Sequence, residues 1–334
     1  MPKVREMGEW RLIAALQTRL ESPASGRLGI GDDTAITHLP EDVQVLTTVD
    51  ALVEGIHFRC TTTSPEALGW KALMVSLSDI AAMGGTPAWA VISLAVPPET
   101  EEEWVLKLYD GLRDAAMAGA CPLVGGDTTG SRGTIMLSLT VVGYTKKPLY
   151  RHTVVAGDIL FTTGPMGRSA AGLWCLENPD KASKLPLSIR QLAISAHTLP
   201  HAQLPAGKAL GALPFRVSLM DNSDGLGVSV RLLAESSKTG MMLTLDDSNL
   251  DPVTQAVATL AGQCPWKWVL EGGEDYHLVG ATAPAHWDEL CHALAQQGVI
   301  AHVIGHATEQ MTLTVSLNQQ LPQPLSQTHG YRHF

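Results

Sequence analysis

The chain has 334 residues, enough for two ordinary domains of roughly 150 residues each, and its 45% hydrophobic and 17% charged residues are typical of a compact globular protein. Its net charge of −10 disfavours a surface that coats nucleic acid, because phosphate backbones are held mainly by clustered lysine and arginine. The sequence has no signal peptide, no run of ~20 apolar residues and no Cys-x-x-Cys pair among its five cysteines, so we expect a cytoplasmic protein without a membrane anchor.

The first half of the chain alternates predicted helices and strands. Periodicity and boundary residues predict helices over 7–20, 64–85 and 101–120, and strands over 43–50, 88–97, 121–127 and 134–145. This alternation is typical of a single α/β unit. The polar, proline-containing segment over 146–158 then marks a junction. We therefore predict an N-terminal domain of residues 1–147 and a C-terminal domain of residues 148–334.

The second half repeats the strand, glycine turn and helix order twice, over 159–174 and 215–237, and adds strands within 268–282 and 300–308. The C-terminal domain is therefore expected to be α/β or α+β. The turn "TTGPMGRSAAG" could place helix N-terminal amides on a phosphate. A tight connection between strand and helix is at least as good an explanation. No "GxxxxGK[ST]" or strand-following "GxGxxG" sequence is present, which excludes the P-loop and dinucleotide-binding motifs.

Aspartates recur at predicted strand ends and glycine turns, where side chains from several segments can converge. A lone aspartate in such a place is usually a turn former or a helix N-cap. Asp79 differs, because it lies inside a predicted helix among apolar neighbours, and a buried carboxylate needs a partner. Too few lysines and arginines lie near these motifs to neutralise the set. The set is Asp32, Asp33, Asp50, Asp79, Asp127, Asp221 and Asp224.

Hard divalent cations are the remaining means of neutralising these aspartates. Oxygen ligands from Asp, Thr and Ser suit Mg²⁺ better than zinc or copper. Carboxylates that hold Mg²⁺ with open water positions can also hold the phosphates of a nucleotide. No cysteine or serine lies in a recognisable activating motif, so nucleophilic catalysis has little support. His57 is the one histidine that we retain as a candidate, because it closes "LVEGIHF" shortly after Asp50.

The motifs taken together resemble those of thiamine-monophosphate kinases. They are "GIGDDTAI", "TTVDALVEGIHF", "KALMVSLSDIAAMGGTPAW", "LVGGDTT", "TGPMGRSAAGL", "MDNSDGL", "EGGEDYHL" and the closing "GYRHF", in this order from about Gly8 to Phe334. The wider superfamily includes aminoimidazole ribonucleotide synthetase, selenophosphate synthetase and the hydrogenase-maturation dehydratases. "LVEGIHF" and "GGEDY" favour the kinase within it.

The resemblance implies a two-domain α/β (α+β) fold of the aminoimidazole ribonucleotide synthetase type, and a homodimer whose N-terminal strands form a shared barrel. It implies that ATP phosphorylates thiamine monophosphate with several Mg²⁺ ions. The implied metal ligands are Asp33, Thr48, Val49, Asp50, Asp79, Asp127, Asp221 and Asp224. Gly126, Asp127, Arg151 and Ser223 match ATP-contact positions, with Tyr109 the candidate for another; His57, Glu274 and Tyr331 match thiamine-phosphate contacts. Asp127, Arg151 and Asp224 are the implied catalytic residues.

One residue departs from the family pattern. Val49 occupies the middle of "TVD", where relatives usually carry threonine. The substitution costs little if that residue binds Mg²⁺ through its carbonyl, and weakens one metal site if the hydroxyl is needed. Two alternatives stay open: another ATP-dependent synthetase of the superfamily, and, raised only by Val49, a Mg-nucleotide-binding protein without catalysis.

Overall fold

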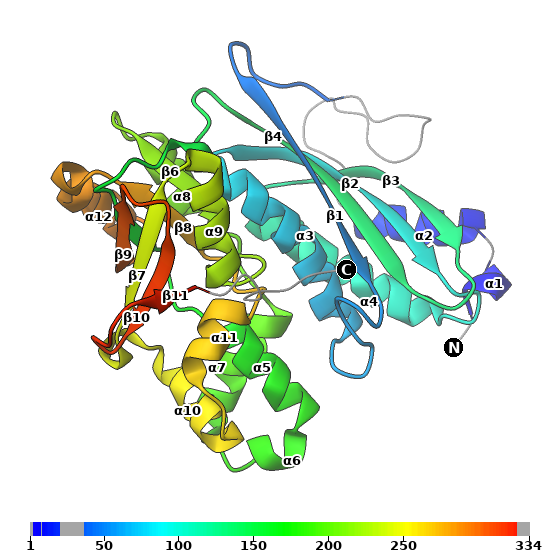
Figure 1. Cartoon of the computed structure of the whole chain (residues 1–334). Helices are drawn as coiled ribbons and strands as arrows, with labels where there is room; N and C mark the ends of the chain where they lie inside the picture. Colours follow the sequence, from blue (N-terminus) through cyan, green and yellow to red (C-terminus); the bar gives the residue numbers. More distant parts are fainter. Residues whose placement is uncertain (1–2, 8, 21–36, 326–334) are drawn as a thin grey trace. The chain divides into compact units, whose positions relative to one another are not determined.

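The computed structural model describes residues 3–7, 9–20 and 37–325. The chain divides into two compact units. Unit 1 comprises Met1–Ile80 and Thr86–Lys146, and unit 2 comprises Ala81–Gly85 and Lys147–Phe334. Figure 1 shows the elements of each unit. No helix in the described ranges is long and apolar enough to cross a bilayer.

Unit 1 contains a four-stranded sheet in the order β1-β4-β2-β3. β4 pairs antiparallel with both β1 and β2, and β2 pairs parallel with β3. The elements, with the last two residues of α3 in unit 2, are α1 (Val4–Met7), α2 (Glu9–Arg19), β1 (Gln44–Val53), α3 (Pro65–Ala82), β2 (Thr86–Val96), α4 (Glu102–Ala118), β3 (Leu123–Gly130) and β4 (Met136–Thr145).

Helices α3 and α4 cover one face of this sheet (Figure 1). The two helices approach closely at glycines, since a Cβ on Gly69 would meet the Leu108 carbonyl oxygen at 2.0 Å and one on Gly111 would meet that of Glu66 at 1.9 Å. The N-terminus of α3 is capped as expected for a Ser-Pro start, because Ser64 Oγ accepts a hydrogen bond from the Ala67 amide. Gly84, with φ +65°, follows the end of the helix.

The sheet has one helix-covered face and one open face. Leu137, Leu139 and Ile92 are almost fully buried on the covered face, whereas Val45, Val49 and Met136 on the other face are 56%, 63% and 41% exposed. Successive strand residues alternate between faces. β1 is also an edge strand. An open apolar face beside an edge strand of the described sheet is a feature that soluble proteins usually cover.

Two strands continue beyond their predicted ends. The sequence pattern predicts that Asp50 ends its strand, but β1 continues to Val53 because Ala51, Leu52 and Val53 keep pairing with β4. Asp127 likewise lies inside β3, since pairing with β2 continues to Gly130. Both aspartates are therefore held in a regular ladder, and their backbone positions are fixed more firmly than in a glycine turn.

Unit 2 contains a mixed seven-stranded sheet in the order β11-β10-β7-β9-β5-β8-β6. Its elements are η1 (Arg151–Thr153), β5 (Ile159–Thr162), α5 (Arg168–Glu177), α6 (Pro179–Ala182), α7 (Leu187–Thr198), α8 (Leu204–Gly211), β6 (Val217–Asp221), α9 (Leu226–Ser237), β7 (Gly240–Leu245), η2 (Asp247–Asn249), α10 (Pro252–Ala261), α11 (Pro265–Glu271), β8 (Leu278–Thr282), η3 (Pro284–His286), α12 (Trp287–Ala295), β9 (His302–Thr308), β10 (Leu313–Leu317) and β11 (Gln323–Pro324). Helices α5, α6, α7 and α10 share a small apolar core.

Candidate active site

The predicted metal ligands of β1 face helix α3. Thr48 and Asp50 are two residues apart on the strand and so point to the same face, which is the one that α3 covers. Ser76 and Asp79 are three residues apart on α3 and so lie on one side of that helix. Thr48 Oγ1 donates a hydrogen bond to Asp79 Oδ2. The structure therefore brings three predicted ligands, Thr48, Asp50 and Asp79, to one strand-helix contact.

Asp50 has an uncompensated oxygen at this contact. Its Oδ2 is buried without a hydrogen-bond partner in the described ranges, and the same is true of Ser76 Oγ. Burial raises the pKa of Asp50 above its ordinary value, while the neighbouring Ser76 hydroxyl and His57 imidazole lower it in part. A buried carboxylate oxygen without a partner is costly. This orphaned oxygen fits a cation, and the oxygen-only donors around it suit Mg²⁺.

Val49 lies between Thr48 and Asp50 and points the other way. Its side chain is 63% exposed on the open face of the sheet. A threonine hydroxyl at this position would project to that open face, away from Asp50 and Asp79. The departure from the family pattern therefore removes no side-chain ligand from this cluster, and Val49 can serve it only through its carbonyl oxygen.

Three predicted nucleotide contacts meet in a second place within unit 1. Tyr109, Gly126 and Asp127 line a cavity of ≈ 90 Å³ together with Ile13 and Leu16 of α2. Burial raises the pKa of Tyr109 to about 12, and Thr128 lowers it in part. The cavity is smaller than the roughly 300–1,000 Å³ of sites that enclose a whole ligand. It can therefore receive only a part of a nucleotide.

Asp50 and Asp127 lie on opposite edge strands of the sheet. The register places Asp50, Leu139, Ile92 and Gly126 in one row across β1, β4, β2 and β3. Three inter-strand spacings of roughly 4.8 Å separate the ends of that row by about 14 Å. Mg²⁺ binds its ligands at about 2.0–2.1 Å. Asp50 and Asp127 of one chain therefore cannot share an ion.

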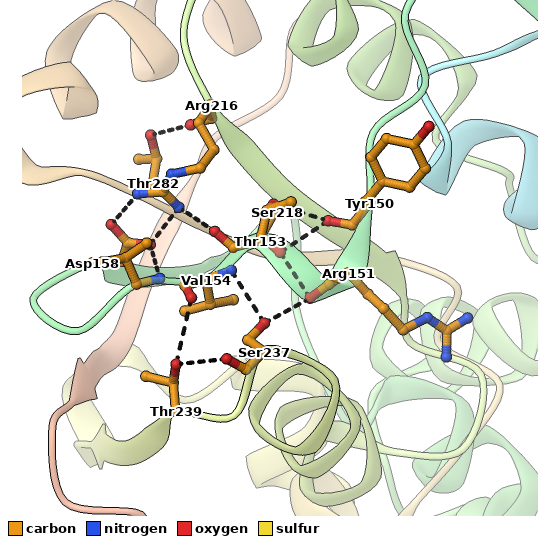
Figure 2. A network of polar contacts seen from close by, with 11 residues as sticks. Tyr150, Arg151, Thr153, Val154, Asp158, Arg216, Ser218, Ser237, Thr239 and Thr282 are labelled. Atoms are coloured by element: carbon orange, nitrogen blue, oxygen red, sulfur yellow. Dashed lines mark hydrogen bonds and ion pairs between the residues drawn. The ribbon is translucent and has the colours of Figure 1, made fainter.

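In unit 2, Arg151 is anchored through its backbone. Its carbonyl oxygen accepts hydrogen bonds from Ser218 Oγ at 2.9 Å and Ser237 Oγ at 3.1 Å. Figure 2 shows this carbonyl inside the polar network and the guanidinium pointing away from it. The residue is exposed. A fixed backbone and an outward guanidinium suit a residue that meets an anionic ligand.

The "MDNSDG" and "GGEDYH" segments pair with one another through backbone hydrogen bonds. Glu274 N donates to Ser223 O at 2.7 Å, Tyr276 N to Asn222 O at 3.1 Å, and Asn222 N to His277 O at 2.8 Å. Gly273 must be glycine for this approach, since a Cβ there would lie 2.4 Å from Ser223 O. Ser223 and Asp224 lie directly after the buried Asp221 at the end of β6, and Glu274 lies on the loop before β8. These three predicted site residues are therefore on two loops that are hydrogen-bonded to each other.

Asp275 is a residue of this region that the sequence analysis missed. Its carboxylate accepts the Gly167 amide at 2.7 Å and the Ser169 amide at 3.0 Å, both at the N-terminus of α5. These amides belong to the "TTGPMGRSAAG" turn, so they are occupied by protein and are not free for a phosphate. The turn is the tight strand-to-helix connection. Asp275 directly follows Glu274 in "EGGEDYHL", and this adjacency is the signal in the sequence that could have identified it.

Burial raises the pKa of Asp275 to about 7, against the opposing effect of the Gly167 and Ser169 amides. The folded protein thus keeps a proton that the unfolded chain releases near its ordinary pKa of 3.8. This contribution to the free energy of unfolding is complete at low pH and is lost as the pH rises to about 7. The asparagine of Asp275→Asn cannot titrate. The amount by which its free energy of unfolding falls below that of wild type should therefore shrink between pH 5 and 8, by at most about 1.4 kcal/mol per pH unit.

Urea unfolding of both proteins at pH 5, 6, 7 and 8 measures this difference. Burial lowers the pKa of His277 to about 4. That shift changes stability in the opposite direction, but it is common to both proteins and cancels in the difference. A destabilisation that grows with pH would show instead that the ionised carboxylate stabilises α5.

The predicted residues that the structure describes do not form a metal centre by themselves. Within the described ranges, no group of three or more His, Cys, Asp or Glu side chains is placed to hold an ion. His57 lies beside β1, where its Nδ1 accepts the Val53 amide at 3.0 Å. Asp33 and Tyr331 lie outside the described residues.

Comparison with known proteins establishes the fold class of the chain. Residues 31–145 match the family model of the AIR synthase related protein, N-terminal domain. The hydrogenase maturation protein HypE of E. coli superimposes with a TM-score of 0.76 over 96% of this chain and 98% of that chain, at 19% identity, which shows the shared fold. The predicted fold class is therefore confirmed.

The family follows from nearer relatives. The chain is 33% identical to the thiamine-monophosphate kinase of Bacillus subtilis (strain 168), over 98% of this chain and 100% of that protein. A solved structure of AaThiL complexed with AMPPCP and TMP is 30% identical, with a TM-score of 0.75 over 100% of this chain and 99% of that chain. The chain belongs to the thiamine-monophosphate kinase family, as its motifs predicted.

Proposed function

We propose that the protein transfers the γ-phosphoryl group of ATP to the phosphate of thiamine monophosphate, giving ADP and thiamine diphosphate, in thiamine diphosphate biosynthesis. The similarity to the B. subtilis kinase along almost the whole of both chains carries this proposal. The AaThiL complex supports both substrates, since AMPPCP is an analogue of ATP. The acceptor is already an anionic phosphate oxygen, so the reaction needs no enzyme nucleophile and little general-base help.

The residues of this chain then act by position and charge. Arg151 meets the transferring phosphates, and Asp127 and Asp224 would hold the cations that keep the reacting groups in line. Tyr109, Gly126 and Ser223 contact ATP, and His57, Glu274 and Tyr331 contact thiamine monophosphate. The ≈ 90 Å³ cavity at Tyr109, Gly126 and Asp127 supports the first group. The pairing of the Ser223 and Glu274 loops supports the proximity of the two substrates in unit 2.

Mg²⁺ supplies the positive charge that cancels repulsion between two polyanions. We assign its ligands to Asp33, Thr48, the Val49 carbonyl, Asp50, Asp79, Asp127, Asp221 and Asp224. The orphaned Oδ2 of Asp50 beside Asp79 is the observation that favours a cation here. Residues 1–147 are proposed to bind Mg-ATP and to dimerise, and residues 148–334 to complete the ATP and substrate sites.

A homodimer accounts for two features of unit 1. The open apolar face at Val45, Val49 and Met136 would be covered by a second copy, as in the shared barrel that the family resemblance implies. Joining β1 of one subunit to β3 of the other would also bring Asp50 and Asp127, which are remote within one sheet, to a common edge. A monomeric mass in sedimentation velocity at micromolar concentration would contradict this assembly.

One assay tests the function against its alternatives. Purified protein with Mg-ATP and thiamine monophosphate is expected to form thiamine diphosphate and ADP in equal amounts. A synthetase of the same superfamily would release ADP only with another acceptor. A non-catalytic nucleotide-binding protein would bind Mg-ATP and form neither product. The orientation of Val49 removes the observation that favoured this last alternative.

A further inference from the structure

The Glu274 carboxylate is contacted from the protein interior by a buried histidine. His197 lies in the last turn of α7, and its side chain is only 7% exposed. Its Nδ1 lies 3.2 Å from Glu274 Oε2 and 3.0 Å from Ser169 Oγ. The three side chains come from the loop before β8, from α7 and from α5. The contact therefore depends on the packing of unit 2 and not on local sequence.

The chemistry of the partners decides which atom carries the proton. A carboxylate oxygen offers only lone pairs, so the contact at 3.2 Å is favourable when His197 Nδ1 carries a proton and directs it at Glu274. The Ser169 hydroxyl oxygen accepts from the same N–H, which keeps the imidazole plane directed at both partners. The Glu274 side chain is 26% exposed. The carboxylate thus contacts His197 and keeps part of its surface exposed to solvent.

The backbone at Glu274 is held in a conformation that non-glycine residues rarely adopt. Its φ is +67°, and that of Tyr276, two residues on, is +52°. Such a backbone conformation is unfavourable for a non-glycine residue and persists only where its surroundings over-determine it. The hydrogen bonds to Ser223 and Asn222 fix this backbone. His197 contacts the Glu274 side chain itself, at 3.2 Å.

We propose that His197 is a positioning residue for thiamine monophosphate, acting through Glu274. The inference rests on the proposed function, in which Glu274 contacts this substrate. Thiamine carries a permanent positive charge on its thiazolium ring, and a carboxylate held in one orientation is complementary to it. ATP carries no such cation. Loss of the His197 hydrogen bond should therefore weaken recognition of thiamine monophosphate and leave that of ATP unchanged.

Two matched substitutions isolate this hydrogen bond. The amide nitrogen of asparagine can occupy the position of imidazole Nδ1, whereas that of glutamine reaches the position of Nε2. His197→Gln is expected to raise the KM for thiamine monophosphate about tenfold, with kcat and the KM for ATP within about twofold of wild type. His197→Asn is expected to restore the KM for thiamine monophosphate to within about threefold. Both remove the ring, so thermal unfolding should show similar stabilities.

A double-mutant cycle separates positioning from a structural role. In a Glu274→Ala background, His197→Gln should change the KM for thiamine monophosphate less than about twofold, because the group that it positions is gone. Equal effects in both backgrounds, or equal losses for ATP and thiamine monophosphate, would overturn the inference. So would indistinguishable Asn and Gln variants. A wild-type protein that forms no thiamine diphosphate would overturn the proposed function, and this inference with it.

Discussion

The Asp50→Asn variant is expected to unfold at a higher urea concentration than wild type in the absence of Mg²⁺, and yet to lose turnover by about 1,000-fold. The carboxylate carries a buried Oδ2 without a partner in the described ranges. Replacing it with a neutral amide removes a buried charge that Ser76 and His57 compensate only in part, and the new NH₂ group can donate to the buried Ser76 hydroxyl. Relief of one unsatisfied buried group corresponds to about 1–3 kcal/mol. Loss of a carboxylate ligand to Mg²⁺ costs several kcal/mol in the transition state.

The measurement is urea unfolding of both proteins with EDTA and with Mg²⁺, together with steady-state kinetics. Added Mg²⁺ should stabilise wild type and have little effect on the variant, because binding to the folded state alone raises stability. Asp114→Asn is the matched control, since its carboxylate is 58% exposed and pairs with Arg113 at the surface of α4. It should change stability by less than about 0.5 kcal/mol and leave turnover intact.

A variant that is less stable than wild type without metal would show that Asp50 has a structural partner, and an active variant would remove it from the metal site. The two readouts move in opposite directions only if the charge is retained for function at a cost in stability. Such trade-offs are expected where a site concentrates like charges.

The fold could be predicted to a large extent because its elements carry local signals. The Ser-Pro-Glu start of α3 and the Gly-Gly after it are capping residues that act within a few positions of the chain. The ends of β1 and β3 could not be predicted in this way. Whether Ala51 and Leu52 or Thr128 and Thr129 stay in a strand depends on partners in β4 and β2, which the local sequence does not specify.

The candidate site was predictable where a charged residue lies in an otherwise apolar segment. Asp79 was conspicuous as a lone charge in an apolar helix, and Thr48 proved to be its partner. Ser76, one turn before Asp79, could have been added from helical spacing alone. His197 and Asp275 could not be assigned their contacts, because these depend on how α7 and α5 pack against the loop before β8. Long-range packing leaves no periodic trace in the sequence.

Two arginines of unit 2 are expected to separate catalysis from stability. Figure 2 shows that Arg216 points into the polar network while the Arg151 guanidinium points out of it. Arg216 binds Asp158 in bidentate fashion, at 2.6 and 2.7 Å, and the Asp158 side chain is only 3% exposed. Arg151 contributes its carbonyl oxygen to the same region. Its guanidinium forms no ion pair with the residues that the structure describes.

Arg151→Ala should lower kcat/KM by about 100- to 1,000-fold, which is the usual effect of removing one group that stabilises charge in a transition state. Its unfolding free energy should change by less than about 0.5 kcal/mol, because the serine hydroxyls still bind the carbonyl at this position. Arg151→Lys should recover part of the activity, since it restores the charge without the planar fork.

Arg216→Ala is expected to do the reverse. It leaves the buried Asp158 carboxylate without its cation and with the Val155 amide as a remaining donor. The expected cost is about 2–3 kcal/mol, toward the low end for a buried pair because the Arg216 side chain is itself 35% exposed. The folded fraction should retain a kcat/KM within about threefold of wild type. Kinetics normalised to folded protein, with urea unfolding of each variant, test both expectations. If Arg151→Ala lost stability and activity together, its guanidinium would belong to the fold and not to the phosphates, and the charge that meets them would have to come from metal ions alone.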